Sequence, residues 1–352
     1  MSYAYNHITP SQTYAWQEIA QFLQNKAGLS LDPGVTDFIE ARHNGNLVAC
    51  AGVDRNIIKC VAIQRCYRGG GVSLRLMSEL FNLLYTRGLN ELYLFTKPEN
   101  MELFTASGFY PIVQHADQVV LMENSSTRLG NYCRLLKALA HDGKKIGSIV
   151  LNANPFTLGH LHLVQTAADA CDWVHVFLVK EDASLFNYHE RFSLVQQGIT
   201  GISNVTLHEG SDYLISRVSF PNYFLKDKAD VDSSHAALDL KLFRENIAPA
   251  LKVTHRFVGS EPLDRVTHAY NQEMRYYLHE DASSAPVVDV VEVERILFDR
   301  LPISASRVRK ALVEGNWELL SHLLPPTTYA FLQKEQEPRW KRRLAGSDDI
   351  FA

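Results

Sequence analysis

Two short segments carry residue types that bind phosphate, and the first of them is Thr157-Leu158-Gly159-His160. It stands between the apolar run 149–151 and a stretch with apolar residues at helical spacing, which predicts a strand, a turn and a helix. Thr157 is placed to cap the helix, and Gly159 removes a side chain where a ligand would approach the backbone. A helix N-terminus offers unpaired N–H groups to an anion, and His160 supplies a further donor. The segment therefore predicts a site for a nucleotide triphosphate.

The second segment is 300–310, which follows the apolar run 287–293 and opens another helix. Ser304 is the expected N-cap, and Ser304, Ser306 and Arg309 offer two hydroxyls and a guanidinium to phosphate. Short motifs recur by chance, so the first segment alone is also compatible with an ordinary helix start, a plain cap and a solvated histidine. The two segments together favour one triphosphate held between two helix starts.

The pair resembles the (H/T)xGH and ISxSxxR motifs of the nucleotidyltransferase superfamily. Residues 157–160 and 303–309 match these motifs in order and in context. The first motif begins with Thr here, as it does in the phosphopantetheine adenylyltransferase branch of that superfamily.

Strands that alternate with helices must position these segments. This alternation predicts a parallel sheet covered on both faces, with ligands at the carboxyl ends of the strands. Lys180 follows one strand end and either contacts phosphate or the substrate carboxylate, or is an ordinary solvated lysine. Gly259 follows another, where a Gly-Ser-Glu-Pro turn would place backbone groups near an adenine ring. The expected strands after the first are 173–179, 204–208 and 255–258, and the expected helices are 188–198 and 239–251. The turn after 255–258 leads into the segment 266–274.

The N-terminal third has a different order of elements. A loop with three glycines, Arg68-Gly69-Gly70-Gly71, joins a strand to an amphipathic helix. The glycines free the backbone to point N–H groups at an anion and Arg68 adds charge, so the loop either cradles a pyrophosphate or is a flexible turn. The surrounding elements are expected to be a helix at 16–29, a hairpin at 37–52, a strand at 56–63, a helix at 74–84, a strand at 91–96 and a helix at 100–109.

This order resembles the GNAT acetyltransferase fold, with its R/QxxGxG/A loop and its closing N…F…GF segment. The loop ends in Ser73, where that family usually has Gly or Ala. The resemblance implies that a pantetheine-pyrophosphate group binds at Arg68, Gly69, Gly71 and Ser73. No residue stands out as a general base for amine acetylation, and Glu40, Asp54 and Tyr110 remain candidates. We therefore interpret this part first as a coenzyme-A-like binding module.

The whole chain is predicted to be α/β, with an N-terminal GNAT-like α+β domain followed by a Rossmann-like parallel-sheet nucleotidyltransferase domain. Its 352 residues and 46% hydrophobic content are sufficient for two cores. The expected division is a GNAT-like domain at 1–127, a connector at 128–145, the nucleotidyltransferase domain at 146–337 and a polar tail at 338–352.

Composition also limits which partners and which cellular compartment are expected for the protein. A net charge of -4 and a pI near 6.4 argue against nucleic acid as the main partner. Five cysteines without CxxC spacing favour a reducing, cytoplasmic compartment. No apolar run approaches the ~20 residues that span a bilayer, so neither membrane insertion nor export is expected.

Taken together, the chain resembles the citrate lyase ligase family, which combines a GNAT-like domain with a TxGH nucleotidyltransferase domain. The resemblance rests on the segments NPFTLGH, SxxSFPNYFLK, RFVGSEP, VTxxYN and ISxSxxR, in this order. It implies an acid–thiol ligase that uses ATP and acetate. The substrate would be the thiol of the coenzyme-A-like prosthetic group on the citrate lyase acyl carrier subunit, acetylated through acetyl adenylate with release of AMP and pyrophosphate.

The resemblance also implies roles for individual residues. Mg²⁺ is expected to enter with the triphosphate, because the sequence shows no set of metal ligands. The expected catalytic residues are His160, Thr157, Arg309 and Lys180, and the expected ATP-binding residues are Asn152, Pro155, Phe156, Gly159, Gly259, Glu261, Ser304 and Ser306.

Two alternatives remain open. One is an adenylyltransferase of the pantetheine-phosphate type, against which the fused GNAT-like part counts. The other is a non-catalytic protein that docks the acyl carrier, against which the intact His160 and Arg309 count.

Overall fold

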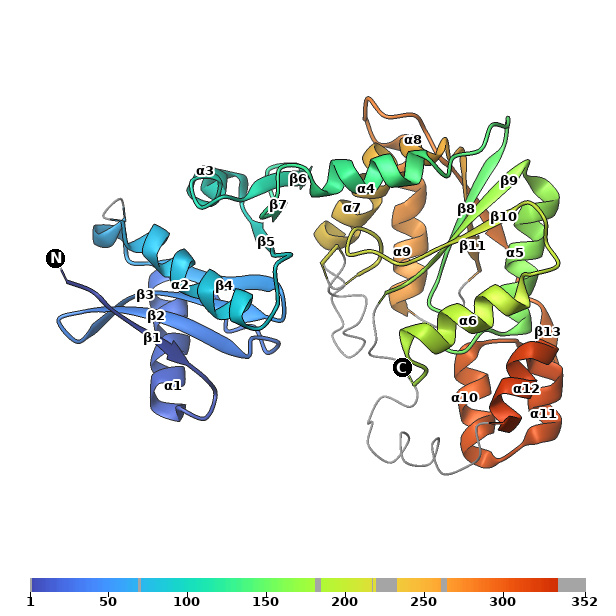
Figure 1. Cartoon of the computed structure of the whole chain (residues 1–352), viewed down its shortest axis with the longest axis horizontal. Helices are drawn as coiled ribbons and strands as arrows, with labels where there is room; N and C mark the ends of the chain where they lie inside the picture. Colours follow the sequence, from blue (N-terminus) through green and yellow to red (C-terminus); the bar gives the residue numbers. More distant parts are fainter. Residues whose placement is uncertain are drawn as a thin grey trace. The chain divides into compact units, whose positions relative to one another are not determined.

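The computed structural model describes residues 2–68, 71–180, 185–216, 218–219, 233–260 and 265–334. The chain divides into two compact units, Met1–Leu129 and Gly130–Ala352, which Figure 1 colours along the sequence. Two of the predicted site residues, Gly69 and Glu261, lie outside the described residues.

The first unit is built on a seven-stranded mixed sheet with the order β1-β2-β3-β4-β5-β7-β6. All neighbouring strands are antiparallel except β4 and β5. The predicted hairpin is confirmed: Asn44 and Gly45 both have positive φ, at 51° and 82°, as a two-residue hairpin turn requires. The strands are β1 Ala4–Ile8, β2 Asp37–His43, β3 Asn46–Asp54, β4 Ile57–Ile63, β5 Tyr93–Thr96, β6 Tyr110–His115 and β7 Val119–Glu123.

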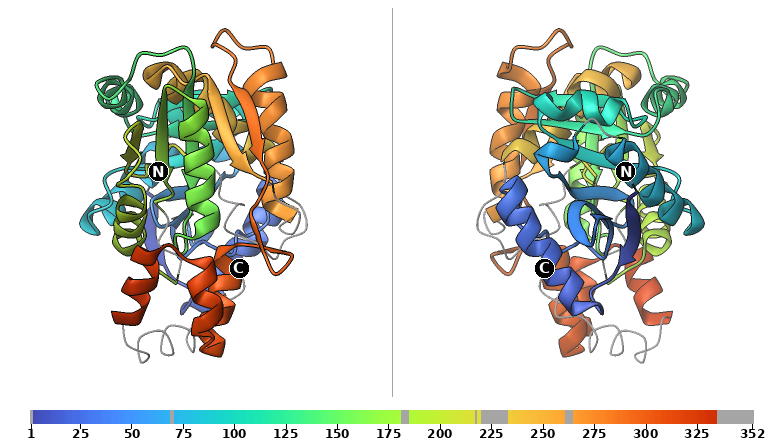
Figure 2. Two further views of the ribbon diagram at one scale, coloured as in Figure 1. Left: turned by 90° about the vertical axis from the view of Figure 1, so that its right-hand side faces the viewer. Right: turned by 90° about the vertical axis from the view of Figure 1, so that its left-hand side faces the viewer.

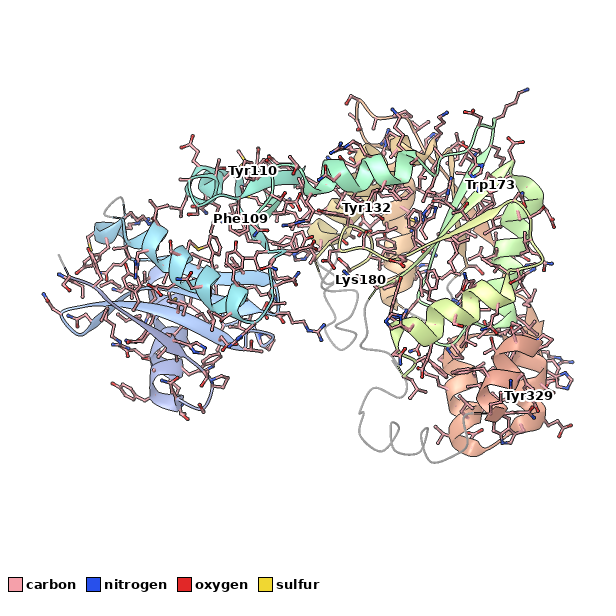
Figure 3. All side chains as sticks on the ribbon, in the orientation of Figure 1. Phe109, Tyr110, Tyr132, Trp173, Lys180 and Tyr329 are labelled. Atoms are coloured by element: carbon pink, nitrogen blue, oxygen red, sulfur yellow. The ribbon has the colours of Figure 1, made fainter. Side chains whose placement is uncertain are left out.

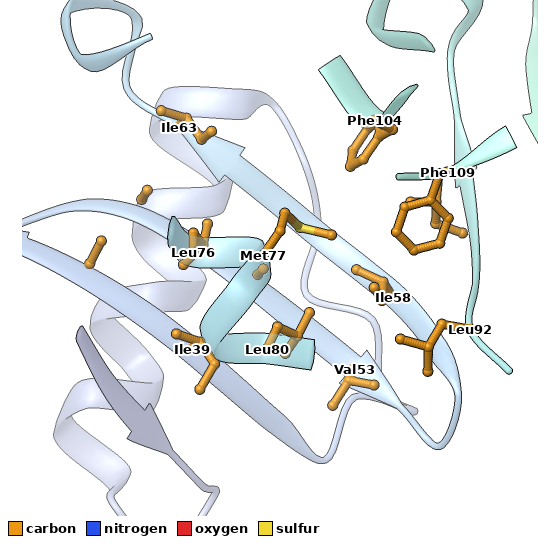
Figure 4. Packing of buried hydrophobic residues seen from close by; sticks show 14 of the residues in the cluster. Ile39, Val53, Ile58, Ile63, Leu76, Met77, Leu80, Leu92, Phe104 and Phe109 are labelled. Carbon is orange, nitrogen blue, oxygen red and sulfur yellow. The ribbon is translucent and has the colours of Figure 1, made fainter. Parts of the chain in front are cut away.

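Helices cover both faces of this sheet, because successive residues of a strand point to opposite sides. Phe38 of β2 packs with α1 (Thr13–Phe22), whereas its neighbour Ile39 packs with α2 (Val72–Thr86). Figure 4 shows Leu76, Met77 and Leu80 of α2 in the second of these cores.

Two predicted helices of this unit differ in extent from the observed ones. The helix expected at 16–29 begins at Thr13 and changes to a π-helical turn, Leu23–Ala27, before Gly28 ends it with φ of 64°. The helix expected at 100–109 is only α3 (Met101–Thr105), because the chain turns through Gly108, whose φ is 87°. Both ends are set by a left-handed glycine.

The second unit is built on a five-stranded, all-parallel sheet with the order β10-β9-β8-β11-β12. The chain order therefore reverses between β8 and β11, and such a switch point is where open parallel sheets bind ligands. The predicted α/β class, with a parallel sheet in the second part, is confirmed. The strands are β8 Ile146–Leu151, β9 Trp173–Leu178, β10 Val205–His208, β11 His255–Gly259 and β12 Asp289–Val293.

Helices α5 (Leu158–Ala170) and α6 (Tyr188–Gly198) share a core with the sheet residues Ile149 and Val176. Three C-terminal helices have a core of their own, which includes Ile303 and Leu320, and Figures 1 and 2 show them gathered at one end of the unit in red. In the described part of this unit, the other helical elements are α4 Arg128–Lys137, α7 Ser233–Leu242, a π-helical turn Phe243–Ile247, α8 Ala248–Leu251, α9 Arg265–Arg275, a π-helical turn Tyr276–Glu280, α10 Ala305–Glu314, α11 Trp317–Leu323 and α12 Pro326–Lys334. The short strands β13 Leu297–Phe298 and β14 Leu301–Pro302 pair just before α10.

Candidate active site

The loop after β8 ends in a reciprocal cap at the start of α5. The Oγ1 of Thr157 accepts a hydrogen bond from the backbone N–H of His160 at 3.3 Å. In return, the backbone N–H of Thr157 donates to Nδ1 of His160 at 3.0 Å. The predicted N-cap is therefore confirmed, and the histidine ring takes the place that a Glu side chain has in an ordinary capping box.

This cap determines which nitrogen of His160 is available to a ligand. Because Nδ1 accepts from Thr157, the neutral ring carries its proton on Nε2. Burial, with a smaller contribution from the positive charge of Arg295, lowers the pKa of His160 to about 4. His160 is therefore an uncharged hydrogen-bond donor at neutral pH.

The ring of Phe156 lies beside that of His160. Phe156 is fully buried in the core between α5 and α6, and its ring lies nearly parallel to that of His160 with centroids 5.8 Å apart. A Cβ on Gly198 of α6 would lie 2.4 Å from the Phe156 ring, so α6 closes against it. The structure therefore places the side chain of Phe156, a predicted ATP-binding residue, in the core beside His160 and α6.

Gly159 brings the two predicted motifs together. A Cβ atom at this position would lie 2.6 Å from the carbonyl oxygen of Ile303, the first residue of the ISxSxxR segment. The sequence predicted that this glycine leaves room for a ligand; its closest neighbour in the structure is instead the backbone of the second motif.

The second motif begins α10 as predicted. The Oγ of Ser304 accepts from the backbone N–H of Arg307 at 3.2 Å, which confirms Ser304 as the N-cap. The Oγ of Ser306 lies 3.0 Å from that of Ser304, so two hydroxyls meet at one helix start. This is the arrangement expected of an anion site at a helix N-terminus.

Arg309 forms a second link between the motifs. Its Nη1 donates to the backbone carbonyl of Asn154 at 2.8 Å, from α10 to the loop after β8. Burial lowers its pKa to about 10, so it stays positively charged at neutral pH. Asn154 in turn accepts from the backbone N–H of Phe186 through Oδ1 at 3.2 Å.

Lys180 lies two residues beyond β9 and Gly259 is the last residue of β11, so both are at the carboxyl ends of the two strands that flank β8 in the parallel sheet. Lys180, labelled in Figure 3, is half exposed, and its Nζ lies 3.8 Å from a carboxylate oxygen of Asp212. The carbonyl of Gly259 accepts from Nδ2 of Asn271 at 3.1 Å, which fixes the turn after β11 to α9.

Sequence reasoning missed Arg191, which organises the loops after β8 and β9. This fully buried side chain donates from Nη1 to the carbonyls of Asn152 and Val179, both at 2.9 Å. Its Nε donates to the carbonyl of Phe186 at 3.1 Å. A usable signal was present, because Arg191 shares the buried stripe of α6 with Leu194 at helical spacing.

Arg295 was missed as well. It follows β12 by two residues, and its Nε donates to the carbonyl of Ser260, just after β11, at 2.6 Å. Its positive charge adds to the effect of burial in lowering the pKa of His160. Nothing in the local pattern marked it, because its position depends on the order of the strands.

In the first unit, the predicted loop joins β4 to α2. Gly71 is the N-cap of α2 with φ of 78°, a conformation that favours glycine, and Ser73 lies in the first helical turn. Nε of Arg68 donates to the carbonyl of Ile63 at 3.3 Å. The helix start is therefore present at the predicted place.

Two further features of this unit bear on its chemistry. Strand β4 carries a bulge at Cys60, whose φ is 53°, and pairs with β5 only at Ile57 and Ile58. Of the candidate general bases, Glu40 is buried and accepts two hydrogen bonds from Arg42, at 2.7 and 2.9 Å. Asp54 is paired with Lys59 at 2.9 Å and Tyr110 is exposed.

Within the described ranges, no group of three or more His, Cys, Asp and Glu side chains is arranged to hold a metal ion. Across the same part of the chain, no helix is long and apolar enough to cross a membrane.

Comparison with known proteins identifies both parts of the chain. Residues 146–332 match the family model described as citrate lyase ligase C-terminal domain, and residues 1–109 match that of the acetyltransferase (GNAT) family.

Three curated proteins, each named "[Citrate [pro-3S]-lyase] ligase", are similar to nearly the whole chain. The Klebsiella pneumoniae protein is 51% identical over 91% of this chain and 93% of its own length. The protein of Escherichia coli (strain K12) is 47% identical over 94% and 93%, respectively. The protein of Haemophilus influenzae is 50% identical over 90% and 94%.

Proposed function

The chain belongs to the citrate lyase ligase family, and we propose that it uses ATP and acetate to acetylate the prosthetic-group thiol of the citrate lyase acyl carrier subunit. AMP and pyrophosphate are the other products. The observation that supports this most strongly is the joining of two helix starts, those of α5 and α10, at the switch point of a parallel sheet.

In the first step, a carboxylate oxygen of acetate attacks the α-phosphorus of ATP. The bond to pyrophosphate breaks and acetyl adenylate remains. Charge develops on the phosphate oxygens, and donors already aimed at that charge accelerate the step. His160 donates from Nε2 without carrying a charge, while the N-termini of α5 and α10 and the hydroxyls of Ser304 and Ser306 bind the phosphate chain.

In the second step, the carrier thiolate attacks the carbonyl carbon of acetyl adenylate. The thioester bond forms, and AMP leaves with the oxygen that acetate donated. The same donors stabilise the departing phosphate, so one set of groups serves both steps.

Arg309, Thr157 and Lys180 have supporting roles in this account. Arg309 holds the loop after β8 through Asn154 and adds positive charge beside the phosphates. Thr157 keeps His160 in the required tautomer. Lys180, just beyond β9, would leave its ion pair with Asp212 and neutralise the negative charge of the substrate's phosphate or carboxylate.

Mg²⁺ is expected to be held by the phosphate oxygens, because the described residues offer no cluster of ligands. Bound there, it would supply charge neutralisation for the departing pyrophosphate.

For the first unit we propose a binding role. The start of α2, with Gly71 as its N-cap, would receive the pyrophosphate of the carrier's coenzyme-A-like arm. Amine acetylation is not part of the proposal, since Glu40 and Asp54 are both engaged by cations. A cytoplasmic location is proposed because all five cysteines are free thiols.

Isotope transfer tests the mechanism directly. Acetate labelled with ¹⁸O in both carboxylate positions is incubated with ATP, thiol-form carrier and the protein. The proposal expects one labelled oxygen in each AMP, because acetate supplies the oxygen that stays on the α-phosphorus. Unlabelled AMP formed at the same rate would rule out the acetyl adenylate route.

A further inference from the structure

The loop after β12 places a guanidinium at the edge of the sheet where the two motifs meet. Arg295 lies two residues beyond Val293, the last residue of β12, and β12 is the neighbour of β11. The next residue, Ile296, accepts through its carbonyl from the backbone N–H of Ile303 at 3.0 Å. Arg295 is therefore tied through the backbone to the start of the ISxSxxR segment.

Its side chain is held in a defined direction. Nε donates to the carbonyl of Ser260 at 2.6 Å, while the N–H of Ser260 donates to the carbonyl of Val293 at 2.9 Å. Nε is also the nearest neighbour that a Cβ at Gly259 would meet, at 4.0 Å. The guanidinium thus lies across the ends of β11 and β12, beside the switch point.

Arg295 also lies near the first motif. Ile303, which is hydrogen-bonded to the residue after Arg295, has its carbonyl oxygen 2.6 Å from the Cβ position of Gly159, the residue before His160. The positive charge of Arg295 accordingly adds to the effect of burial in lowering the pKa of His160. An imidazole N–H and a guanidinium at one edge form a donor pair that matches an oxyanion, and Arg is well suited to phosphate and carboxylate because its planar fork donates in parallel.

We infer that Arg295 is a catalytic residue that binds a substrate oxyanion next to His160. The inference rests on the proposed function and adds a residue to it. Two sources of the oxyanion share this chemistry, the phosphate chain of ATP and the carboxylate of acetate. Removing a charged donor costs about 1.5–3 kcal/mol of binding, or about tenfold to a hundredfold in affinity or rate.

The test compares Arg295→Met and Arg295→Lys with Arg275→Met as a matched control. Arg275 is exposed at the end of α9, where it pairs with Glu292, and it belongs to neither motif. Equilibrium binding of α,β-methylene-ATP and of acetate is measured separately, followed by acetate-dependent exchange of pyrophosphate into ATP. The His160 pKa is followed by NMR in each variant.

The expected result is a loss of at least about tenfold in Arg295→Met, with Arg275→Met within about twofold of the unaltered protein. Weaker nucleotide binding identifies phosphate as the oxyanion, and a raised acetate KM identifies the carboxylate. The His160 pKa should rise in Arg295→Met and stay low in Arg295→Lys, which keeps the charge but lacks the fork.

Unchanged binding and exchange in both Arg295 variants would overturn the inference. Should the unaltered protein bind nucleotide but catalyse no exchange, the proposed reaction fails while the binding comparison still decides the role of Arg295. If Arg295→Met does not fold, the comparison is made with Arg295→Lys and its urea unfolding is measured alongside. A tenfold loss of binding or rate with unchanged unfolding supports the inference, and unchanged binding and rate overturns it.

Discussion

The carbonyl oxygen of Ile303 lies where a side chain on Gly159 would have to be, 2.6 Å from the ideal Cβ position. The start of α5 and the segment before α10 therefore touch through their backbones, although 144 residues separate Gly159 from Ile303 (303 minus 159). The bond from Arg309 to Asn154 ties the same two segments a second time. The proposed triphosphate site depends on these two links.

Gly159→Ala should damage both stability and activity. The added methyl group meets a backbone atom, which cannot rotate away, and overpacking of this kind costs about 1–3 kcal/mol. Urea unfolding and pyrophosphate exchange measure the two effects. Gly130→Ala is the matched control, because a Cβ there meets nothing within 4 Å and Ala favours the helix α4. Equal behaviour of the two variants would contradict the account.

The rate of the reaction should not decrease near pH 6.5 through protonation of His160. Since the folded-state pKa of His160 is lowered to about 4, the ring keeps its neutral, Nε2-protonated form down to about pH 5. An NMR titration of His160 and the pH profile of pyrophosphate exchange check this. A ring that titrates near 6.5 would contradict it.

The same lowered pKa has a consequence for stability. Between about pH 6.5 and about pH 4 the unfolded chain takes up a proton at this residue and the folded protein does not. Stability should therefore fall as the pH decreases through this range, and His160→Gln should reduce the slope there. Burial also lowers the pKa values of His175 and His208, to about 3 and about 4, so these residues should account for the slope that remains.

Arg191→Lys should destabilise the second unit although it preserves the charge. Lysine cannot serve the carbonyls of Asn152, Val179 and Phe186 from one planar group, and carbonyls left unsatisfied in the interior cost at least about 2 kcal/mol. Arg275→Lys, at an exposed pair with Glu292, is the control and should change stability by less than about 0.5 kcal/mol. Calorimetric unfolding of both variants makes the comparison.

Asp37→Asn should lower the free energy of unfolding of the first unit at neutral pH, and this effect should disappear in acid. The guanidinium of Arg87, with a further hydrogen bond from His7, holds the pKa of the Asp37 carboxyl well below its usual range. A depressed carboxyl pKa stabilises the fold above the unfolded value near 4, and this contribution disappears as the pH falls below it. Urea unfolding at pH 7 and at lower pH measures the difference. Asp117→Asn, at an exposed turn, should show none.

Local patterns were sufficient to predict the elements and caps of the site. Thr157 and Ser304 were predicted as N-caps because capping depends on residues within one turn, and both are confirmed. The roles of Arg191 and Arg295 were not predicted, because each depends on which strands become neighbours. That Phe156 binds nucleotide stays a prediction; the burial of its ring against α6 could not be predicted, because it depends on how that helix packs.

The most direct test of the proposed function is release of AMP and pyrophosphate from ATP in the presence of acetate. Thiol-form citrate lyase carrier is compared with buffer and with free pantetheine phosphate. The account predicts AMP formation that requires both acetate and the carrier thiol. Pyrophosphate release with pantetheine phosphate in the absence of acetate would instead make the protein an adenylyltransferase, and no product in any mixture would contradict catalysis altogether.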